Sequence, residues 1–289
     1  MKIINSLNEI SNNYEAIFMD LWGCVHDGRQ ALPNAIVALQ NYKKTGGKVV
    51  LVTNSPQMQQ EVKQQLTSFG VPEDVWDGIA SSGDSARVAM FQGVVGKKIW
   101  FIGEERDKRF FDPLNIVENP VHIMRVNLDD AEGIVCTGPF NPVDDPETLL
   151  PKLKIAAERG LKFLCANPDI VVDRGNEREW CAGALAKLYS SIGGESLYFG
   201  KPHQQIYDLA FQQLDRIHPG IAKHSILATG DGIQTDIRGA INQQIDSLFV
   251  TGGLAAMETK TQEQPDIKAL QKFLSDAGLE PTFSIGHLR

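Results

Sequence analysis

The sequence has little of what marks a secreted, membrane-bound or nucleic-acid-binding protein. Its 289 residues contain only four cysteines and fewer basic than acidic side chains, so the formal net charge is −8. Nucleic acids and anionic membranes are bound through basic surfaces, and this charge balance argues against both as partners. No apolar run approaches the roughly 18 residues that cross a bilayer, and residues 1–14 lack the apolar stretch of a signal peptide.

The cysteines give no sign of a disulfide framework or a zinc site. Cys24, Cys136, Cys165 and Cys181 lie far apart, and no two of them have the C-x-x-C spacing. We therefore expect small buried apolar side chains in a reducing compartment. With the missing signal peptide, this predicts a soluble, cytoplasmic protein.

The composition is that of an ordinary globular chain. Hydrophobic residues make up 42% and charged residues 22%, while 26 glycines and 14 prolines are too few for a low-complexity or disordered sequence. A chain of this length can bury a sizeable core and is long enough for two domains.

Short apolar runs, each followed by a helical pattern, indicate a parallel sheet with crossover helices. The middle of the chain has the same pattern, but its strands do not end in acidic residues. We predict an α/β fold, with a Rossmann-like, doubly wound parallel sheet in residues 1–81 and 198–289 and a separate α/β domain inserted at 82–197. The strand candidates are Glu15–Asp20, Lys48–Thr53, Lys98–Ile102, Gly133–Thr137, Lys162–Ala166, Ser225–Gly230 and Asp246–Val250.

Polar residues stand where the outer strands end. Ligands of an open parallel sheet bind beyond the carboxyl ends of its strands, so these positions are the candidate site. Asp20 follows the first strand, Thr53 and Asn54 follow the second, and Asp231 follows a later one with Asp236 a helical turn further on.

These residue types indicate phosphoryl transfer. Two converging carboxylates repel each other unless a divalent cation lies between them, and oxygen ligands of this kind suit Mg²⁺. A threonine hydroxyl, an asparagine amide and the ammonium group of Lys201 would supply donors for phosphoryl oxygens. The set predicts attack by a carboxylate on phosphorus and an aspartyl-phosphate intermediate.

Taken in order, the motifs resemble those of the haloacid dehalogenase superfamily of phosphatases. The middle segment is similar to the large inserted cap of the class IIA, NagD-like nitrophenylphosphatase branch, on the strings GEE at Gly103, CANPD at Cys165 and CAGALAKLY at Cys181. The four superfamily motifs are DLWGCVHDG from Asp20, VTN from Val52, GKP from Gly200 and GDGIQTD from Gly230.

The resemblance implies a role for each residue of the metal site. Asp20 would be the nucleophile and a magnesium ligand, and Asp231 would be a second ligand. Position 22 would contribute only its backbone carbonyl, and Asp236 would support the metal directly or through water.

The resemblance also implies the phosphate site. Thr53 and Asn54 would hold the phosphoryl oxygens, and Lys201 would neutralise charge on the phosphate and on the nucleophile. In the inserted domain, the loop with Asn167 and Asp169 would face the active site and read the substrate. The alternative is that this loop is an Asx-type turn closed by the proline between them.

Trp22 departs from the family pattern. Phosphatases of this superfamily usually carry a second aspartate there, which protonates the leaving alcohol and activates water. An indole does not exchange protons, and loss of general acid–base help typically costs about 10²–10⁴-fold in rate. Either His26 supplies the proton, or the leaving group needs little protonation, or the protein binds a phosphorylated ligand with little turnover. For His26 itself, we favour a hydrogen-bonded turn residue over an acid.

The sequence thus predicts a magnesium-dependent hydrolase of small phosphomonoesters, with catalysis by Asp20 and Lys201. The alternative is a phosphate-ligand-binding or regulatory protein with weak turnover. The expected partner is a small phosphorylated metabolite whose identity the sequence leaves open. The resemblance suggests a homodimer, because inserted caps of this type often look like dimerisation surfaces, and the sequence leaves the oligomeric state open.

Overall fold

The chain folds into two compact units. A computed structural model describes residues 1–113, 119–174 and 177–289. The first unit contains residues 1–53, 63–80 and 206–289, and the second contains residues 54–62 and 81–205. Each unit is built on its own β-sheet. Among the described residues, no helix is long and apolar enough to span a membrane.

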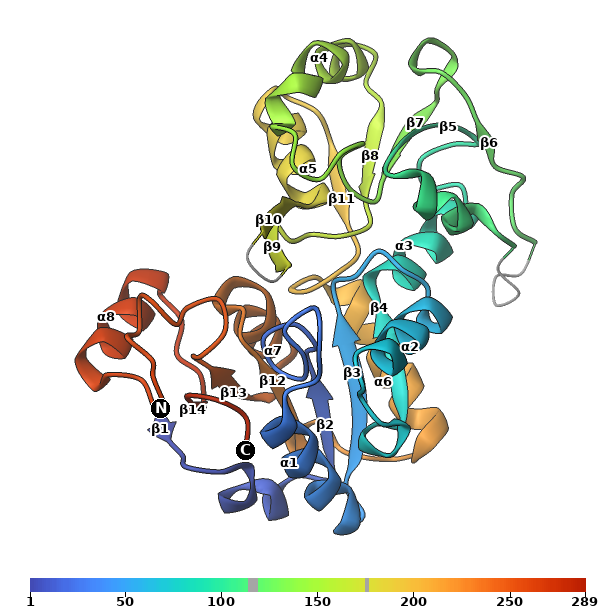
Figure 1. The fold of residues 1–289 in the computed structure, drawn as a ribbon. Coiled ribbons are helices and arrows are strands. Elements are labelled where there is room, and N and C mark those ends of the chain that lie inside the picture. Colours follow the sequence, from blue (N-terminus) through green and yellow to red (C-terminus); the bar gives the residue numbers. More distant parts are fainter. Residues whose placement is uncertain (114–118, 175–176) are drawn as a thin grey trace. The chain divides into compact units, whose positions relative to one another are not determined.

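The sheet of the first unit has seven strands in the order β1-β14-β13-β12-β2-β3-β4 (Figure 1). The paired strands from β1 through β3 in this order run parallel. The strand bounds are β1 Lys2–Ile3, β2 Ala16–Met19, β3 Lys48–Thr53, β4 Gly78–Ser81, β12 Ile226–Gly230, β13 Asp246–Val250 and β14 Phe283–Ile285.

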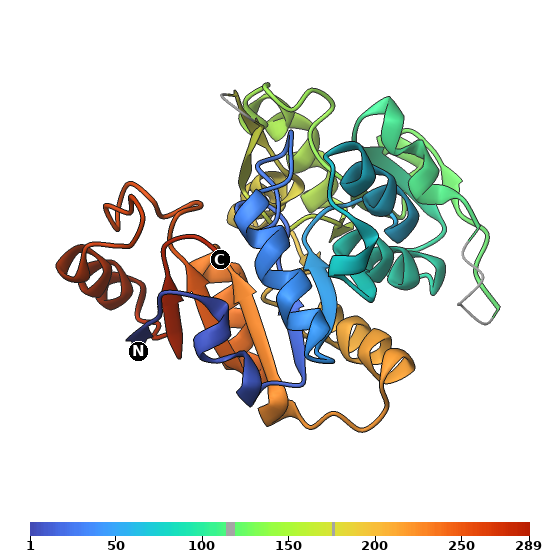
Figure 2. The same ribbon diagram turned by 60° about the horizontal axis from the view of Figure 1, so that its bottom comes forward.

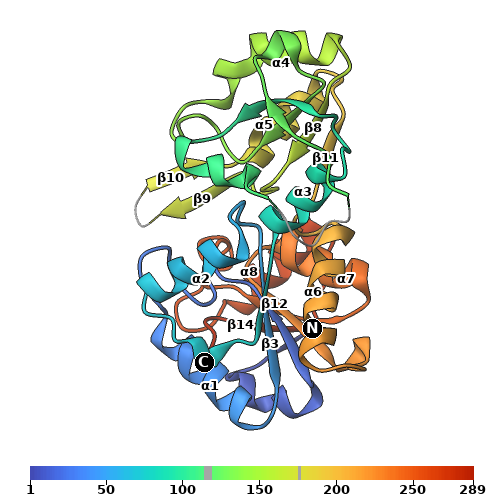
Figure 3. The same ribbon diagram turned by 90° about the vertical axis from the view of Figure 1, so that its right-hand side faces the viewer.

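Helices cover both faces of this sheet, because its central strands are apolar on both sides. Tyr207 of α6 packs on one face against Phe18 of β2 and Val50 of β3. Helix α1 packs against β3 on the other face (Figures 1 and 3). The helices with residues in this unit are α1 Pro33–Lys44, α2 Gln59–Ser68, α6 Gln204–Ile217, α7 Arg238–Gln243 and α8 Ile267–Ala277.

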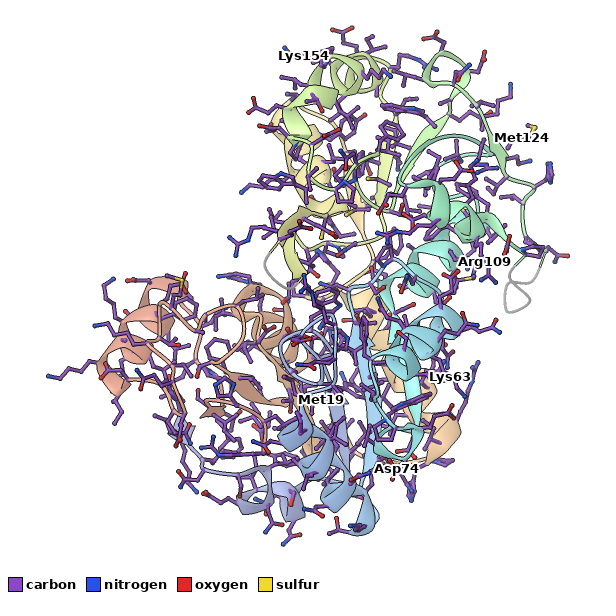
Figure 4. All side chains as sticks on the ribbon, in the orientation of Figure 1. Met19, Lys63, Asp74, Arg109, Met124 and Lys154 are labelled. Carbon is purple, nitrogen blue, oxygen red and sulfur yellow. The ribbon has the colours of Figure 1, made fainter. Side chains whose placement is uncertain are left out.

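Both chain ends belong to the first unit. The N-terminal strand β1 pairs in parallel with β14, and the blue and red segments are side by side in Figure 2. Leu270 and Leu274 of α8 pack against Phe249 of β13 and so cover this end of the sheet. Met19, labelled in Figure 4, is the last residue of the central strand β2.

The second unit has a five-stranded parallel sheet in the order β11-β8-β7-β5-β6. A separate antiparallel hairpin is formed by β9 and β10 (Figure 3). The bounds are β5 Lys98–Ile102, β6 Met124–Arg125, β7 Gly133–Cys136, β8 Lys162–Cys165, β9 Val171–Arg174, β10 Glu177–Trp180 and β11 Ser196–Tyr198, with helices α3 Ser82–Phe91, α4 Leu150–Glu158 and α5 Ala182–Ser191.

Successive residues of the central strands point to opposite faces of this second sheet, and each face has its own helices. Ile134 of β7 belongs to the core formed with α4 and α5. Its neighbour Val135 belongs to the core formed with α3. The unit is therefore a second α/β layer structure with helices on both faces of its sheet. The predicted α/β class, with a doubly wound parallel sheet and a separate α/β unit, is confirmed.

Candidate functional site

Asp20 and Asp231 lie at the ends of neighbouring parallel strands in the first unit. Met19 of β2 is paired with Thr229 of β12, and the main-chain N–H of Asp20 donates to the carbonyl oxygen of Thr229 at 2.9 Å. Both carboxyl ends therefore meet at one edge of the sheet, as the alternation of strands and helices predicts. The two aspartates are buried, at 8% and 5% exposure.

The two carboxylates come close together, and the thiol of Cys24 joins them. One ligand atom from each of Asp20, Cys24 and Asp231 lies within 4.8 Å of the others. In the part of the chain that the structure describes, no other group of three histidine, cysteine or acidic residues is this compact. Two buried carboxylates at this separation favour a cation between them, and their hard oxygen donors fit Mg²⁺.

Small residues make room for the carboxylate of Asp231. The main-chain N–H of Leu254 donates to its Oδ2 at 2.9 Å. A β-carbon placed on Gly23 would lie 2.2 Å from this oxygen, and one on Gly253 would lie 2.0 Å from it. Neither glycine was predicted from the sequence as part of the site, although the Gly-Gly pair at 252–253, one residue after β13, is a signal for such a turn.

Asp236 supports the turn that follows Asp231. It lies on a single turn of π-helix, Ile233–Ile237, which leads into α7. Its Oδ2 accepts hydrogen bonds from the main-chain N–H of Gly232 and the hydroxyl of Thr235, both at 3.2 Å. The compact ligand group does not include Asp236, so these contacts fit a supporting role rather than that of a close ligand.

Thr53 and Asn54 stand where β3 ends, and both are buried. Thr53 is the last residue of that strand, which lies beside β2 in the sheet of the first unit. Asn54 belongs to the second unit, where its carboxamide contacts Lys201 and Asp169.

The second unit brings the remaining predicted residues together. The Asn54 side chain donates to Oδ1 of Asp169 at 2.8 Å and accepts from the main-chain N–H of Lys201 at 2.7 Å. The main-chain N–H of Asp169 donates to Oδ1 of Asn167 at 3.1 Å, which is the Asx-type turn given above as the alternative for this loop.

Comparison with known proteins places the chain in a family. A haloacid dehalogenase-like hydrolase model matches residues 17–117, and a second model of haloacid dehalogenase-like hydrolases matches residues 198–274. The crystal structure of a hydrolase of the haloacid dehalogenase-like family from Brucella suis is 36% identical, covers 99% of this chain and 100% of that one, and has a TM-score of 0.86. The chain belongs to the haloacid dehalogenase-like hydrolases.

Two curated proteins are similar to this chain over most of its length. A protein named 5'-nucleotidase YutF from Bacillus subtilis is 25% identical over 86% of this chain and 92% of its own length. A protein named acid sugar phosphatase from Staphylococcus saprophyticus is 24% identical over 85% of this chain and 90% of its own length. Both names describe hydrolysis of a small phosphorylated compound.

This haloacid dehalogenase-like hydrolase has an aromatic cluster after strand β2. The rings of Trp22 and His26 meet edge to face, with centroids 5.3 Å apart. The rings of His26 and Phe69 also meet edge to face, with centroids 5.0 Å apart. Position 22, where the resemblance leads one to expect an aspartate, thus holds a partly buried indole that packs against His26. The aromatic contacts hold the indole against the turn.

His26 is a neutral, buried side chain in this cluster. Burial lowers its pKa from 6.5 to about 4, and its Nδ1 accepts the main-chain N–H of Gly28 at 3.0 Å. With Nδ1 accepting, the proton of the neutral ring is on Nε2, which is buried and has no hydrogen-bond partner among the described residues. A ring with this pKa carries no extra proton at neutral pH, which favours the hydrogen-bonded turn residue over the replacement acid.

Proposed function

We propose that this hydrolase is a Mg²⁺-dependent phosphatase of small phosphomonoesters that works through a phosphorylated Asp20. The observation that carries the proposal is the buried pair of Asp20 and Asp231 at the ends of adjacent parallel strands. Membership of the family and the names of both curated relatives support it.

In the proposed reaction, a carboxylate oxygen of Asp20 attacks phosphorus and forms an acyl phosphate. The bond from phosphorus to the ester oxygen breaks, and that oxygen leaves with the electron pair and takes up a proton. Water then attacks the phosphorus of the acyl phosphate, which releases inorganic phosphate and restores the Asp20 carboxylate. Thr53 and Lys201 would hold the phosphoryl oxygens, and for Lys201 this role rests on its place in the Gly200-Lys201-Pro202 motif.

The metal would be held by residues of the first unit. Asp20 and Asp231 would be anionic ligands, the main-chain carbonyl of Trp22 a neutral one, and Asp236 would support the site through the turn that it stabilises. Bound Mg²⁺ would neutralise the two carboxylates and the charge of the phosphoryl group. The softer thiol of Cys24 is a poor ligand for Mg²⁺, so the two carboxylates carry this proposal.

Substrate choice would lie with the inserted segment. We propose that residues 82–197 act as a cap on a core formed by residues 1–81 and 198–289. Curated relatives named for nucleotide and sugar phosphate hydrolysis favour a small phosphorylated metabolite as the substrate.

Trp22 favours a second candidate, a phosphate-ligand-binding protein with weak turnover. Without an acid at position 22, and with His26 neutral, neither of these two side chains would protonate a leaving alcohol at neutral pH. The two carboxylates argue for the hydrolase, because a binding protein has no need of a nucleophile next to a metal site.

The test is phosphate release from a panel of aryl phosphates, sugar phosphates and nucleoside monophosphates, measured with and without Mg²⁺. The phosphatase proposal expects release in Mg²⁺ for at least one class and none in EDTA. Saturable binding of a panel member with no release in any metal would favour the binding protein instead.

A further inference from the structure

The carboxamide of Asn54 has no N–H left for a substrate. Its Nδ2 donates to Oδ1 of Asp169 at 2.8 Å and to the main-chain carbonyl of Lys201 at 3.3 Å. A carboxamide has two N–H donors, so both are in use. Its Oδ1 accepts the main-chain N–H of Lys201 at 2.7 Å, and the residue is 4% exposed. The carboxamide therefore binds protein groups and leaves none of its donors for phosphoryl oxygens.

Asp169 and Lys201 together fix which way the carboxamide faces. A carboxylate only accepts hydrogen bonds, so the amide nitrogen of Asn54 faces Asp169. The main-chain N–H of Lys201 only donates, so the amide oxygen faces Lys201. Both partners demand the same orientation, and both main-chain polar groups of Lys201 are held by this one side chain.

The surrounding residues leave this arrangement little freedom. A β-carbon placed on Gly200 would lie 2.5 Å from Oδ1 of Asn54 and 2.6 Å from Cδ of Pro168. Asp169 is itself held by the Asx-type turn from Asn167. Within the second unit, the loop at 167–169 and the segment at 200–201 therefore pack tightly on one asparagine.

We propose that Asn54 is a positioning residue that holds the main chain of Lys201, and that Asp169 acts through Asn54 rather than by contact with the substrate. The proposal rests on the proposed function, in which Lys201 binds the phosphoryl group. A catalytic cation must be placed to a fraction of an ångström, and a displacement of about 1 Å can cost 10²-fold in rate. Asn54 supplies that placement from a position 147 residues away in the sequence.

The first test needs no turnover. Mass spectrometry measures hydrogen exchange of the Lys201 main-chain amide in the unsubstituted protein and in three variants, Asn54→Ala, Asp169→Asn and Asp169→Ala. We expect at least tenfold faster exchange in Asn54→Ala, a smaller acceleration in Asp169→Ala and little change in Asp169→Asn, which keeps an acceptor oxygen. Asn141→Ala is the matched control, because Asn141 donates to Asp144 in an exposed pair of the same chemistry. Unchanged exchange at Lys201 in both Asn54→Ala and Asp169→Ala would overturn the proposal.

The second test uses turnover of an aryl phosphate and a double-mutant cycle with Lys201→Ala. If the Asn54 side chain acts through Lys201, Asn54→Ala should lower kcat/KM about 10- to 100-fold in the wild-type background. In the Lys201→Ala background the same substitution should lower kcat/KM less than threefold. Asp169→Asn should retain most of the activity that Asp169→Ala loses. Equal losses from Asn54→Ala in the two backgrounds would refute positioning while leaving the phosphatase proposal intact. No release from the wild type would refute the phosphatase proposal, and the exchange measurement would still decide the role of Asn54.

Discussion

The indole of Trp22 occupies the space in which a side chain on Gly28 would begin. A β-carbon on Gly28 would be 2.4 Å from Cζ3 of Trp22 and 2.6 Å from Cη2, closer than real side chains approach. Gly28 also has a φ of +84°, a backbone conformation that L side chains rarely adopt. Trp22 and Gly28 therefore depend on each other, and the aromatic residue at position 22 has a site made for it.

Gly28→Ala should destabilise the protein more than a glycine substitution at the same backbone angle elsewhere. Gly46 is the matched control, because its φ is +93° and nothing lies within 4 Å of a β-carbon placed there. Gly46→Ala should cost the backbone strain alone, about 1–2 kcal/mol. Gly28→Ala should cost about 1–3 kcal/mol more, since it also pushes on the indole. Urea unfolding measures both, and equal losses would mean that Trp22 is free to move away.

His26 should make the protein lose stability as the pH falls. Its folded pKa of about 4 lies below the ordinary value of 6.5, so the unfolded chain binds more protons between these two pH values. The free energy of unfolding should therefore fall between pH 6.5 and pH 4, by an amount on the order of 3 kcal/mol. In His26→Asn, whose side chain can still accept the Gly28 N–H, this part of the pH dependence should disappear. An unchanged slope in the variant would contradict the neutral, buried assignment.

Trp22 should make the reaction depend steeply on the leaving group. With no acid at position 22, aryl and acyl phosphates should react much faster than alkyl and sugar phosphates. Trp22→Asp should raise alkyl phosphate turnover more than aryl phosphate turnover, and a tenfold gain corresponds to about 1.4 kcal/mol.

Trp22→Phe is the packing control for this substitution, because it keeps an aromatic ring next to His26 and supplies no acid. It should leave the leaving-group dependence unchanged. Two results together would identify His26 as the general acid. They are a wild-type rate that does not depend on leaving-group acidity and a loss of alkyl phosphate turnover in His26→Ala.

Much of the fold followed from the sequence because apolar strands and helical periodicity are local signals. The predicted strands at Lys48–Thr53, Lys98–Ile102 and Asp246–Val250 have the bounds found in the structure. The strand β1 was missed because its two residues offer no pattern. The strand β11 is short and incompletely buried, so it also gives a weak signal.

The site was predictable only as far as strand ends determine it. The closeness of Asp20 and Asp231 was predictable because parallel strands bring their carboxyl ends to one edge of the sheet. Cys24 was expected to be buried, and it is, but its place beside the carboxylates depends on a turn in which its N–H donates to the carbonyl of Leu21. The use of the Asn54 carboxamide depends on partners 115 and 147 residues away, for which a single sequence holds no local signal.

Mg²⁺ should stabilise the protein through Asp231. At a concentration 100 times its dissociation constant, the ion should add about 2.7 kcal/mol to the free energy of unfolding. Asp231→Asn should lose this gain and the Mg²⁺-dependent activity, while Asp236→Asn should keep part of both because its contacts are to the turn. Titration calorimetry and thermal unfolding measure the binding, and Ca²⁺ should support turnover poorly because it prefers a larger oxygen shell. Full activity in EDTA would contradict a metal role.

The central claim is that Asp20 becomes phosphorylated, and its direct test is acid quenching of the protein during turnover of an aryl phosphate in Mg²⁺. Peptide mass spectrometry of the quenched protein should find one phosphoryl group on the peptide that contains Asp20, in a form that hydroxylamine removes. Asp20→Asn should carry no such group and release no phosphate, while its thermal unfolding stays close to that of the wild type. Continued phosphate release by Asp20→Asn, or a phosphoryl group on a different residue, would contradict the account.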